Sequence, residues 1–389
     1  MIISNWYKDL PYESRATSVK ANILPGIAEA EFGDKYGIMQ FSCDVSDFDT
    51  DKILKFNIDI KSSGCMIDIY AIWYKNGKEV FKEYIEQSYN IKPYKGCDRL
   101  VISVLARSQE NGRIKILRPS VEYGDKFTAR NAVVSSLCIP YGFEWEHKQR
   151  ECSRNLEDSI CAIDRLCKDM KHDLVVLTEN FYSRNTCADF ASAAIREDGK
   201  EIELMRQAAA RNKTYLSFSF REVDEEGYYY NSALLIGRSG EIILKYHKTH
   251  ITTNEKVSGL VPGDGIAVAD TDFARVGIAI CWDLYYPEFC RLLSKNGAEI
   301  IINPSAGFNQ EMHRMRARDS GAFIVTAGTY GDSTVIVDPY GEIIANGILT
   351  GAATSKINLD ERFKVRMLSV HSYSERKNIY LHEMRNDLY

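Results

Sequence analysis

The sequence contains no apolar run near the roughly 18–20 residues that a membrane-spanning helix needs. Its beginning, Met1 to Glu13, mixes polar and charged residues and has no apolar stretch of the kind found in secretion signals. Internal repeats and low-complexity segments are absent as well. These absences lead us to expect a cytoplasmic protein without a membrane partner.

An excess of positive charge is also missing. The chain carries 49 Lys and Arg against 54 Asp and Glu, a net charge of −5, and its pI is near 5.9. A general nucleic-acid binder would show a basic face, so we expect no nucleic-acid partner. The ten cysteines have no regular spacing. Without an export signal, this favours reduced thiols over a disulfide framework.

The remaining composition, 45% hydrophobic and 26% charged, is that of an ordinary soluble globular protein. A chain of 389 residues favours two domains, because single cores rarely grow past about 250–300 residues. We place the boundary between residues 127 and 128, where the hydrophobic period changes near the polar run Gly124-Asp125-Lys126.

Residues 1–127 show the period-two alternation of half-buried strands, for example from Leu54 to Ile60. Asn76-Gly77, between Ile67–Tyr74 and Val80–Tyr84, is a strong hairpin signal because both residues tolerate positive φ. No convincing ten-residue helix precedes position 145. The pattern predicts an all-β, jelly-roll-like sandwich. Its default role is packing or oligomerisation, with a carbohydrate or another partner as the alternative.

Residues 128–389 alternate strand and helix. A short apolar strand precedes residues that recur at helical spacing from Leu156 to Met170. The predicted elements that follow are a helix at Glu201–Arg211, a hairpin around Arg238-Ser239-Gly240 and a second hairpin at Asp338-Pro339-Tyr340-Gly341. This order predicts an α/β domain.

Three polar residues follow apolar runs in this part of the chain. Glu179 ends the run from Leu174, Lys248 follows Glu241 to Tyr246, and Cys281 follows Val276 to Ile280. We interpret Cys281 as a thiol at the end of a buried strand and ahead of a helix, where the backbone field favours thiolate. A thiol, a carboxylate and an ammonium at three element ends can form one site.

Such a trio suits the cleavage of a carbon–nitrogen bond. A thiolate attacks the carbon and leaves a thioester that water cleaves. Glu179 takes the thiol proton, gives it to the departing amine and then activates water. Lys248 faces the oxyanion, with the backbone N–H of Trp282 as a second donor.

The residues around the trio form short motifs: Leu177-Thr178-Glu179-Asn180, Lys248-Thr249-His250 and Ile280-Cys281-Trp282-Asp283. In order and spacing they resemble the Glu-Lys-Cys triad motifs of the nitrilase superfamily of carbon–nitrogen hydrolases. Glu255, seven residues after Lys248, is similar to that family's second glutamate. Further similar segments are Pro262-Gly263, Pro287-Glu288, Asn303-Pro304-Ser305, Arg316-Ala317-Arg318 and Arg376-Lys377-Asn378-Ile379-Tyr380.

The resemblance covers about residues 128–385 and leaves the first 127 outside. It implies a four-layer α-β-β-α sandwich, a homodimer or higher homo-oligomer, and no metal or organic cofactor. Some residues depart from the family. Thr178 stands where many members have Pro, Asp283 is closer to the amidase and carbamoylase branches than to nitrilases, and Leu284-Tyr285 replaces a basic pair that holds substrate carboxylates in some carbamoylases.

Residues beside the triad are expected to line the substrate pocket: Asn180, Trp282, Tyr285 and Tyr286. For Tyr285, packing beneath the nucleophile turn is an equal alternative. His250 suggests a Cys-His-Asp arrangement with Cys281 and Asp283, and with His247 a metal site, but we interpret it as structural. Cys290 is interpreted as a small core residue.

The resulting hypothesis is a cysteine-dependent hydrolase of small linear amides or N-carbamoyl compounds that releases ammonia through a thioester. The alternatives are a nitrilase acting on a small nitrile, a Cys-His enzyme, and a non-catalytic binding or scaffold protein on the same fold.

Overall fold

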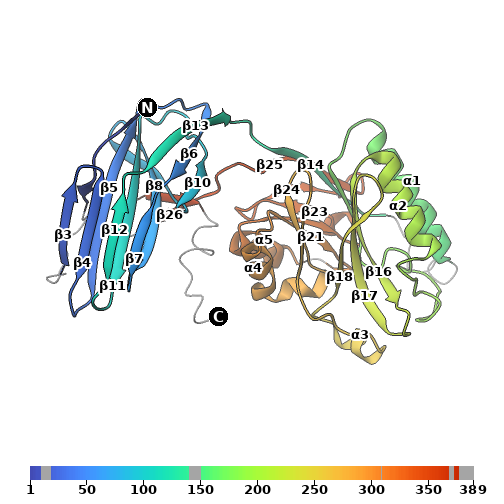
Figure 1. Cartoon of the computed structure of the whole chain (residues 1–389). Helices are drawn as coiled ribbons and strands as arrows, with labels where there is room; N and C mark the ends of the chain where they lie inside the picture. Colours follow the sequence, from blue (N-terminus) through green and yellow to red (C-terminus); the bar gives the residue numbers. More distant parts are fainter. Residues whose placement is uncertain (10–18, 140–149, 308, 368–371, 376–389) are drawn as a thin grey trace. The chain divides into compact units, whose positions relative to one another are not determined.

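The structure is a computed structural model, and it describes residues 1–9, 19–139, 150–307, 309–367 and 372–375. The chain divides into two compact units. The first comprises Met1–Thr128 and Lys364–Tyr389, and the second Ala129–Phe363. Figure 1 shows the first unit built from strands and the second from strands and helices.

The first unit contains three β-sheets. In the eight-stranded sheet the order is β1 (Ile2–Ile3), β5 (Gly37–Ser46), β11 (Arg99–Ser108), β8 (Met66–Lys75), β9 (Lys78–Tyr84), β27 (Ser372–Glu375) and β26 (Lys364–Met367), with β2 (Tyr7–Lys8) also on β5. The four-stranded sheet is β3 (Val19–Leu24), β4 (Ile27–Phe32), β12 (Arg113–Leu117) and β7 (Ile60–Ser63). The three-stranded sheet is β10 (Ser88–Ile91), β6 (Lys52–Asn57) and β13 (Ser120–Lys126).

One hydrophobic core joins these sheets. It combines alternate residues of the large sheet, such as Phe41 and Trp73, with Phe56 and Ile116 of the smaller ones. The predicted hairpin is present: Asn76 and Gly77 both have positive φ between β8 and β9. Trp73 is fully buried and donates to Glu83 Oε1 over 3.0 Å, so its ring is not a free stacking surface.

The C-terminal segment differs from the predicted division of the chain. The predicted boundary assigned residues 128–389 to the second domain, whereas β26 (Lys364–Met367) and β27 (Ser372–Glu375) belong to the first unit. The reason is an edge pairing that local sequence does not reveal. β26 and β27 form an antiparallel pair, and Ser374 of β27 pairs in parallel with Lys82 of β9.

The second unit contains two six-stranded sheets and a set of helices. One sheet has the order β18 (Ile242–His247), β17 (Tyr229–Ile236), β16 (Tyr215–Val223), β15 (Leu174–Leu177), β14 (Asn131–Leu137) and β25 (Ala352–Asn358). The other is β19 (Ala267–Asp270), β20 (Arg275–Ile278), β21 (Ile300–Pro304), β22 (Phe323–Ala327), β23 (Val335–Val337) and β24 (Ile343–Asn346). Among the residues that the structure describes, the α-helices are α1 (Cys152–Lys168), α2 (Lys200–Asn212), α3 (Thr253–Val257), α4 (Pro287–Lys295) and α5 (Gln310–Ser320), and the 3₁₀ turns are η2 (Cys281–Tyr285) and η3 (Gly331–Ser333).

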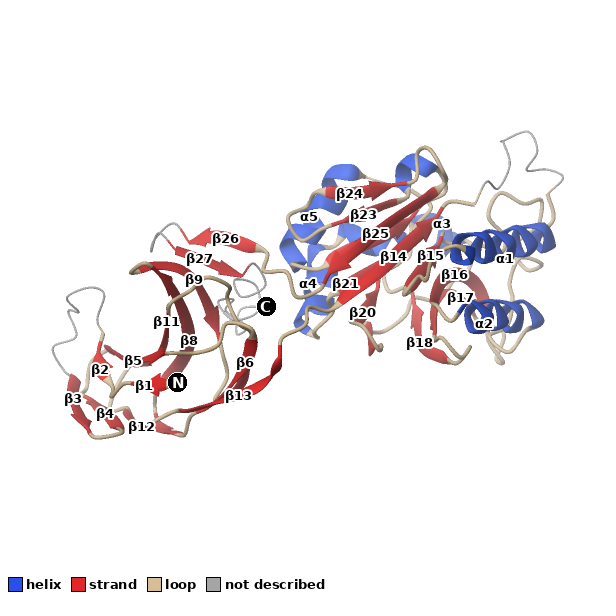
Figure 2. Cartoon of the chain, turned by 90° about the horizontal axis from the view of Figure 1, so that it is seen from above, coloured by secondary structure: helices blue, strands red, loops and turns tan. Residues whose placement is uncertain are grey.

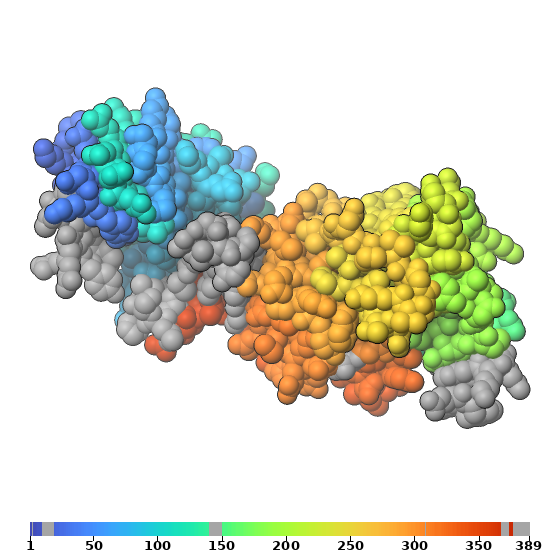
Figure 3. Space-filling view, turned by 90° about the horizontal axis from the view of Figure 1, so that it is seen from below, coloured from blue at the N-terminus to red at the C-terminus, as the bar shows by residue number. Residues whose placement is uncertain are grey.

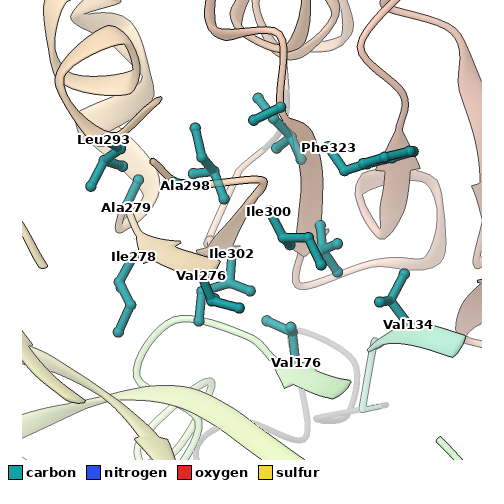
Figure 4. Close-up of a cluster of buried hydrophobic side chains, with 14 of the residues drawn as sticks. Val134, Val176, Val276, Ile278, Ala279, Leu293, Ala298, Ile300, Ile302 and Phe323 are labelled. Carbon is teal, nitrogen blue, oxygen red and sulfur yellow. The ribbon is translucent and has the colours of Figure 1, made fainter. Parts of the chain in front are cut away.

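The two sheets pack face to face between two pairs of helices, as Figure 2 shows. Residues of β14 and β15 share one core with β20 and β21, and Figure 4 shows Val176 opposite Val276 and Ile302 in this layer. A second core lies between the first sheet and α1 and α2, where Leu177 and Phe218 meet Ile163 and Met205. Helices α4 and α5 cover the other sheet. The predicted α/β fold is therefore correct for this unit.

Strands at the centres of both sheets have continuous apolar sequences, because both faces of each sheet are covered. Leu174–Leu177 is buried at every position, and so is Ile300–Pro304. The polar residues of the candidate site lie where strands of these sheets end. Across the described ranges of the chain, the helices are too short or too polar for a membrane crossing.

Candidate active site

The structure brings the predicted acid and amine together and sets the thiol beside them. Glu179 follows the end of β15, Lys248 directly follows β18, and Cys281 opens η2 shortly after β20. In the space-filling view, yellow surface from residues near 250 lies beside orange surface from residues near 300 (Figure 3). The site therefore forms where strand ends of the two sheets of one unit meet.

Glu179 is held in one orientation by hydrogen bonds to both carboxylate oxygens. Its Oε1 accepts from Lys248 Nζ and from Asn231 Nδ2, each over 2.8 Å. Its Oε2 accepts from the backbone N–H of Ala306 over 3.1 Å. The side chain is 5% exposed, so these contacts replace water around the charge.

Lys248 lies between two carboxylates. Its Nζ also donates to both oxygens of Glu255, each over 3.1 Å, and its side chain is 1% exposed. Glu255 is fixed by a capping box at the start of α3, where its Oε2 accepts from the Thr252 N–H over 2.7 Å and its own N–H donates to Thr252 Oγ1 over 3.3 Å. Helix capping thus orients the second glutamate toward the lysine.

Cys281 has an unusual backbone. Its φ is +42°, in the left-handed region that a side chain rarely adopts. Such conformations persist where surrounding structure enforces them, and they often mark functional sites. The thiol interacts with the Ser305 hydroxyl and the Ala306 N–H, and the same N–H donates to Glu179. Ala306 therefore connects the thiol to the carboxylate.

The charges of the site shift the pKa values in a consistent way. Burial alone would raise the pKa of Glu179, but the charges of Lys248 and Arg184 and the hydrogen bonds from Lys248 and Asn231 lower it to about 2. Burial lowers the pKa of Lys248, but Glu179, Cys281 and Glu255 more than offset this and raise it. The resting site thus holds a carboxylate and an ammonium.

The thiol behaves differently from the prediction. Burial and the negative charge of Glu179 raise the pKa of Cys281 above its ordinary value of 9.0, against the opposing effects of Lys248, Ser305 and Ala306. The expected thiolate at a helix start is therefore wrong for the resting site. Cys281 opens only a five-residue 3₁₀ turn, whose dipole is too short to compensate for desolvation.

Asp283 braces the turn that carries Cys281. Its Oδ2 accepts from the Ile280 N–H and from Tyr246 Oη, each over 2.8 Å. Its Oδ1 accepts from the backbone N–H of His250 over 3.0 Å and lies 2.9 Å from His250 Nδ1. The carboxylate is fully buried, and it fixes the turn from both sides.

His250 and His247 have separate surroundings. His250 bonds to Asp283 and stacks on Tyr286 with ring centroids 3.9 Å apart. His247 Nε2 lies 3.1 Å from Glu222 Oε2, and the His247 ring stacks on Tyr230. Within the described residues, no group of three His, Cys, Asp or Glu side chains has a metal-binding arrangement.

The residues predicted to line the pocket lie around the turn. Trp282 and Tyr286 line a hollow of about 420 Å³ together with the start of α3. Tyr285 is 46% exposed and stacks on Trp282, with centroids 3.9 Å apart, so it does not pack beneath the turn. Asn180 adopts a positive φ, and its Oδ1 is buried without a hydrogen-bond partner among the described residues.

Two further residues at the site were not predicted. Asn231 Nδ2 bridges Glu179 Oε1 and Glu255 Oε1, over 2.8 and 2.7 Å. Arg184 donates through Nε and Nη2 to the backbone carbonyl of Glu179, over 3.0 and 2.7 Å. Neither residue lies in a recognised motif. The one available signal for Asn231 is a polar residue at the start of an apolar strand.

Other motif residues support the turn. Asn303 Nδ2 donates to the Ala279 carbonyl over 2.9 Å, and Arg316 Nε donates to the Leu284 carbonyl over 2.7 Å. Thr178 Oγ1 donates to the Ser305 carbonyl over 2.7 Å, a contact that proline could not make. Cys290 is fully buried in the core, and burial raises its pKa to about 12. The segment Arg376–Tyr380 lies outside the described residues.

Comparison with known proteins agrees with this architecture. The family model for carbon–nitrogen hydrolases matches residues 139–362. The chain is 32% identical over 219 residues to nitrilase homolog 2 of Dictyostelium discoideum, covering 49% of this chain and 66% of that protein. It is 26% identical over 252 residues to the omega-amidase NIT2 of Homo sapiens, covering 58% and 91%.

Solved structures show the same fold. Saccharomyces cerevisiae Nit3, a member of branch 10 of the nitrilase superfamily, matches with a TM-score of 0.51 and 22% identity, over 60% of this chain and 93% of that one. An amidase from Nesterenkonia sp. matches with a TM-score of 0.53 and 18% identity, over 68% and 97%. Because the family model covers more than half of the sequence, this chain belongs to the carbon–nitrogen hydrolase family of the nitrilase superfamily.

Proposed function

We propose that the protein is a cysteine-dependent hydrolase of small linear amides or N-carbamoyl compounds. One observation carries the proposal: a buried lysine lies between two glutamates, and one of these glutamates shares the Ala306 N–H with Cys281. This arrangement supplies a nucleophile, a proton carrier and a positive charge within one largely dry site, which is what cleavage of a resonance-stabilised amide requires.

In the first step, Cys281 Sγ bonds to the amide carbon while its proton moves to Glu179. The C–N bond then breaks, and Glu179 returns the proton to the departing nitrogen as ammonia leaves. Lys248 and the Trp282 N–H stabilise the oxyanion. Losing one such donor typically costs about 3 kcal/mol in the transition state.

Proton transfer from the resting thiol to Glu179 is uphill, because the pKa of Cys281 is raised and that of Glu179 is lowered to about 2. C–S bond formation therefore has to accompany the transfer. As the oxyanion develops, Lys248 interacts with it, and the interaction between Lys248 and Glu179 weakens. The pKa of Glu179 then rises while the proton arrives.

In the second step, water attacks the thioester, and Glu179 takes the proton of that water. The C–S bond breaks, Cys281 regains a proton, and the carboxylic acid product leaves. Glu255 positions Lys248 throughout. Asn180, Trp282, Tyr285 and Tyr286 contact the substrate in this proposal.

Amides are favoured over nitriles because the relatives named above include an omega-amidase and an amidase. A nitrilase acting on a small nitrile is the second candidate: the thiol would add to the nitrile to form a thioimidate, water would add to it, and ammonia would leave as the thioester forms. A Cys-His enzyme is disfavoured, because the groups that act on the Cys281 thiol are Glu179, Lys248, Ser305 and Ala306, whereas the His250 ring packs against Tyr286 and Phe289. A scaffold role is disfavoured because the thiol, acid and amine are all retained.

We also propose a homodimer or higher homo-oligomer, following the resemblance. For the first unit we keep a jelly-roll-like topology with a packing or oligomerisation role, and carbohydrate as the alternative ligand.

The test is ammonia release from a panel of linear amides, N-carbamoyl compounds and nitriles, with Cys281→Ala as the variant and Cys290→Ala as the matched control. We expect turnover of at least one amide, its loss in Cys281→Ala and its persistence in Cys290→Ala. Undiminished turnover in Cys281→Ala would end the proposal.

A further inference from the structure

A second positively charged group lies next to the candidate triad and takes no part in the mechanism above. Arg221 is on β16, where Leu216, Phe218 and Phe220 face α1 and α2. Because strand residues alternate between faces, Arg221 is on the opposite face with Ser219, which donates to Asn231 Oδ1 over 2.6 Å. Arg221 therefore faces the catalytic side of the sheet.

The strand register fixes how near Arg221 is to the catalytic carboxylates. Arg221 is directly paired with Asn231 across β16 and β17, and directly paired residues have Cβ atoms about 4.5–5.5 Å apart on the same face. Asn231 is the residue that bridges Glu179 and Glu255. The side chain of Arg221 therefore begins next to Asn231, the residue that contacts both glutamates.

The guanidinium of Arg221 is positioned by Phe190, but one of its N–H groups makes no hydrogen bond within the described residues. It lies over the ring of Phe190, 4.1 Å from the centroid, and Nη1 donates to the Phe190 carbonyl over 3.2 Å. Its Nε is buried and has no hydrogen-bond partner among the described residues. A buried donor without a partner is costly, so a ligand acceptor would stabilise this arrangement.

The charges around Arg221 are also unbalanced. Glu179 and Glu255 both pair with Lys248, and Arg184 lies 3.6 Å from Glu179 Oε2. In the described part of the chain no carboxylate pairs with Arg221. Burial and the nearby charge of Arg184 lower the pKa of Arg221, and Glu255 opposes this only in part. An anion bound near Arg221 and Arg184 would offset the repulsion between their positive charges.

We infer that Arg221, assisted by Arg184, forms an anion subsite, and that the preferred substrate is an amide carrying a carboxylate a few bonds from the scissile carbonyl. The planar guanidinium fork suits a carboxylate, which it can bind through two parallel hydrogen bonds. This inference rests on the proposed function and names its substrate class. It also places the carboxylate site away from Leu284-Tyr285, where the basic pair of some carbamoylases is missing.

The competing explanation is structural, since Arg221 also anchors Phe190. Substrate charge separates the two explanations. The probes are succinamate and glutaramate, compared with the neutral amides butanamide and pentanamide. We expect wild-type kcat/KM to favour the carboxylate-bearing amides about tenfold or more, the scale of one charge-assisted hydrogen bond. Arg221→Met should reduce this ratio about tenfold, mainly through KM.

The matched control is Arg196→Met, which removes a positive charge of the same unit that pairs with Asp198 on the surface. It should leave the ratio unchanged. Arg221→Lys keeps the charge without the planar fork and should give an intermediate ratio. A wild-type ratio near one, or an equal fall for both substrate classes in Arg221→Met, would overturn the inference.

Binding of glutarate to the Cys281→Ala protein, followed by calorimetry, separates this inference from the proposed function. Glutarate binding that disappears in the Cys281→Ala, Arg221→Met double variant supports the subsite even if no amide is hydrolysed. Amide turnover by the wild-type protein without glutarate binding and without charge preference would refute the subsite and leave the proposed function standing.

Discussion

At the scale of single residues, the candidate site depends on neighbours as much as on the triad itself. Glu179 receives hydrogen bonds from Lys248, Asn231 and Ala306. Three donors to a buried carboxylate favour its ionised form. Its low pKa is therefore a property of the surrounding donors, and removing one of them should be visible in catalysis.

Asn231→Ala tests this dependence. The variant removes the donor shared by Glu179 and Glu255, so we expect kcat to fall by about 10- to 100-fold, the scale of a hydrogen bond to a charged group. Because the lost bond favoured the carboxylate form, the pKa of Glu179 should rise, and the acid limb of kcat against pH should move to higher pH. Steady-state kinetics over a pH series measure both effects.

Asn212→Ala is the matched control, since Asn212 bonds Asp164 and the Ala208 carbonyl on α2. It should leave kcat and the acid limb where they are. A wild-type pH profile in Asn231→Ala would show that Asn231 has no positioning role.

The sequence singled out the candidate catalytic residues, but not the residues that position them. Glu179, Lys248, Glu255 and Cys281 lie in motifs whose order and spacing are readable along the chain. Asn231 becomes meaningful only through the register that places it beside Arg221. Cross-strand pairing of this kind has no local signal.

At the scale of elements, the turn at Cys281 is held by a buried network centred on Asp283. The carboxylate fixes the Ile280 N–H at the end of the strand region and the backbone of His250 on a separate loop. It therefore connects the turn at Cys281 to the segment that follows Lys248. The positive φ of Cys281 depends on this support.

Asp283→Asn should disrupt the turn. Asparagine has one acceptor oxygen where aspartate has two. The NH2 group of the asparagine would therefore face Tyr246 Oη or a backbone N–H, which are donors, and the hydrogen bond that Asp283 accepts there would be lost. We expect the free energy of unfolding to fall by about 1–3 kcal/mol or more, together with a large loss of turnover. Urea unfolding and ammonia release measure the two effects.

The control for this change is Asp319→Asn, because Asp319 is a partly exposed partner of Arg316 on α5. It should cost much less stability. Equal stability of the wild-type and Asp283→Asn proteins would contradict the proposed bracing of the turn.

Periodicity predicted most elements of the second unit, because its strands and helices bury complete faces. The helix predicted at Glu201–Arg211 is α2, and the hairpin at Arg238-Ser239-Gly240 joins β17 and β18. The sequence predicted Cys281 at the end of a buried strand and ahead of a helix, and the short turn η2 lies between β20 and α4. Its 3₁₀ geometry is supported by the tertiary contacts of Asp283, and the raised pKa of Cys281 follows from burial and the charge of Glu179. Neither could be inferred from the sequence.

At the scale of the whole molecule, the chain combines a family domain with an all-β unit that the family model does not cover. The sequence predicted this combination from the change of period near residue 128. It did not predict that β26 and β27 return to the first unit, because edge pairing with β9 depends on a strand far away in sequence.

Buried carboxylates also make the stability of the molecule depend on pH. Burial opposes ionisation of Glu222, but hydrogen bonds from His247, Lys245 and Ser232 lower its pKa from 4.5 to about 2. Glu179 is lowered to the same range. A group with a depressed pKa stabilises the fold above its unfolded value, and this contribution is lost as pH falls toward the folded value.

We therefore expect the free energy of unfolding to fall as pH decreases from about 4.5 toward 2. For the Glu222→Gln variant, the free energy of unfolding should fall less steeply over this window, because only Glu179 of the two carboxylates with a lowered pKa remains. Glu225→Gln, which changes an exposed residue (83% exposed), should follow the wild type. Urea unfolding at a series of pH values measures these slopes, and identical slopes for wild type and Glu222→Gln would contradict the assignment.

The central claim is that the sulfur of Cys281 forms a covalent bond with the substrate carbon during turnover. Acid-quenching the wild-type enzyme during amide hydrolysis, followed by peptide mass spectrometry, tests it most directly. We predict an adduct equal to the amide minus ammonia on the peptide containing Cys281, and no adduct on the peptide in Cys281→Ala. Steady turnover without any adduct, continuing in Cys281→Ala, would contradict the claim.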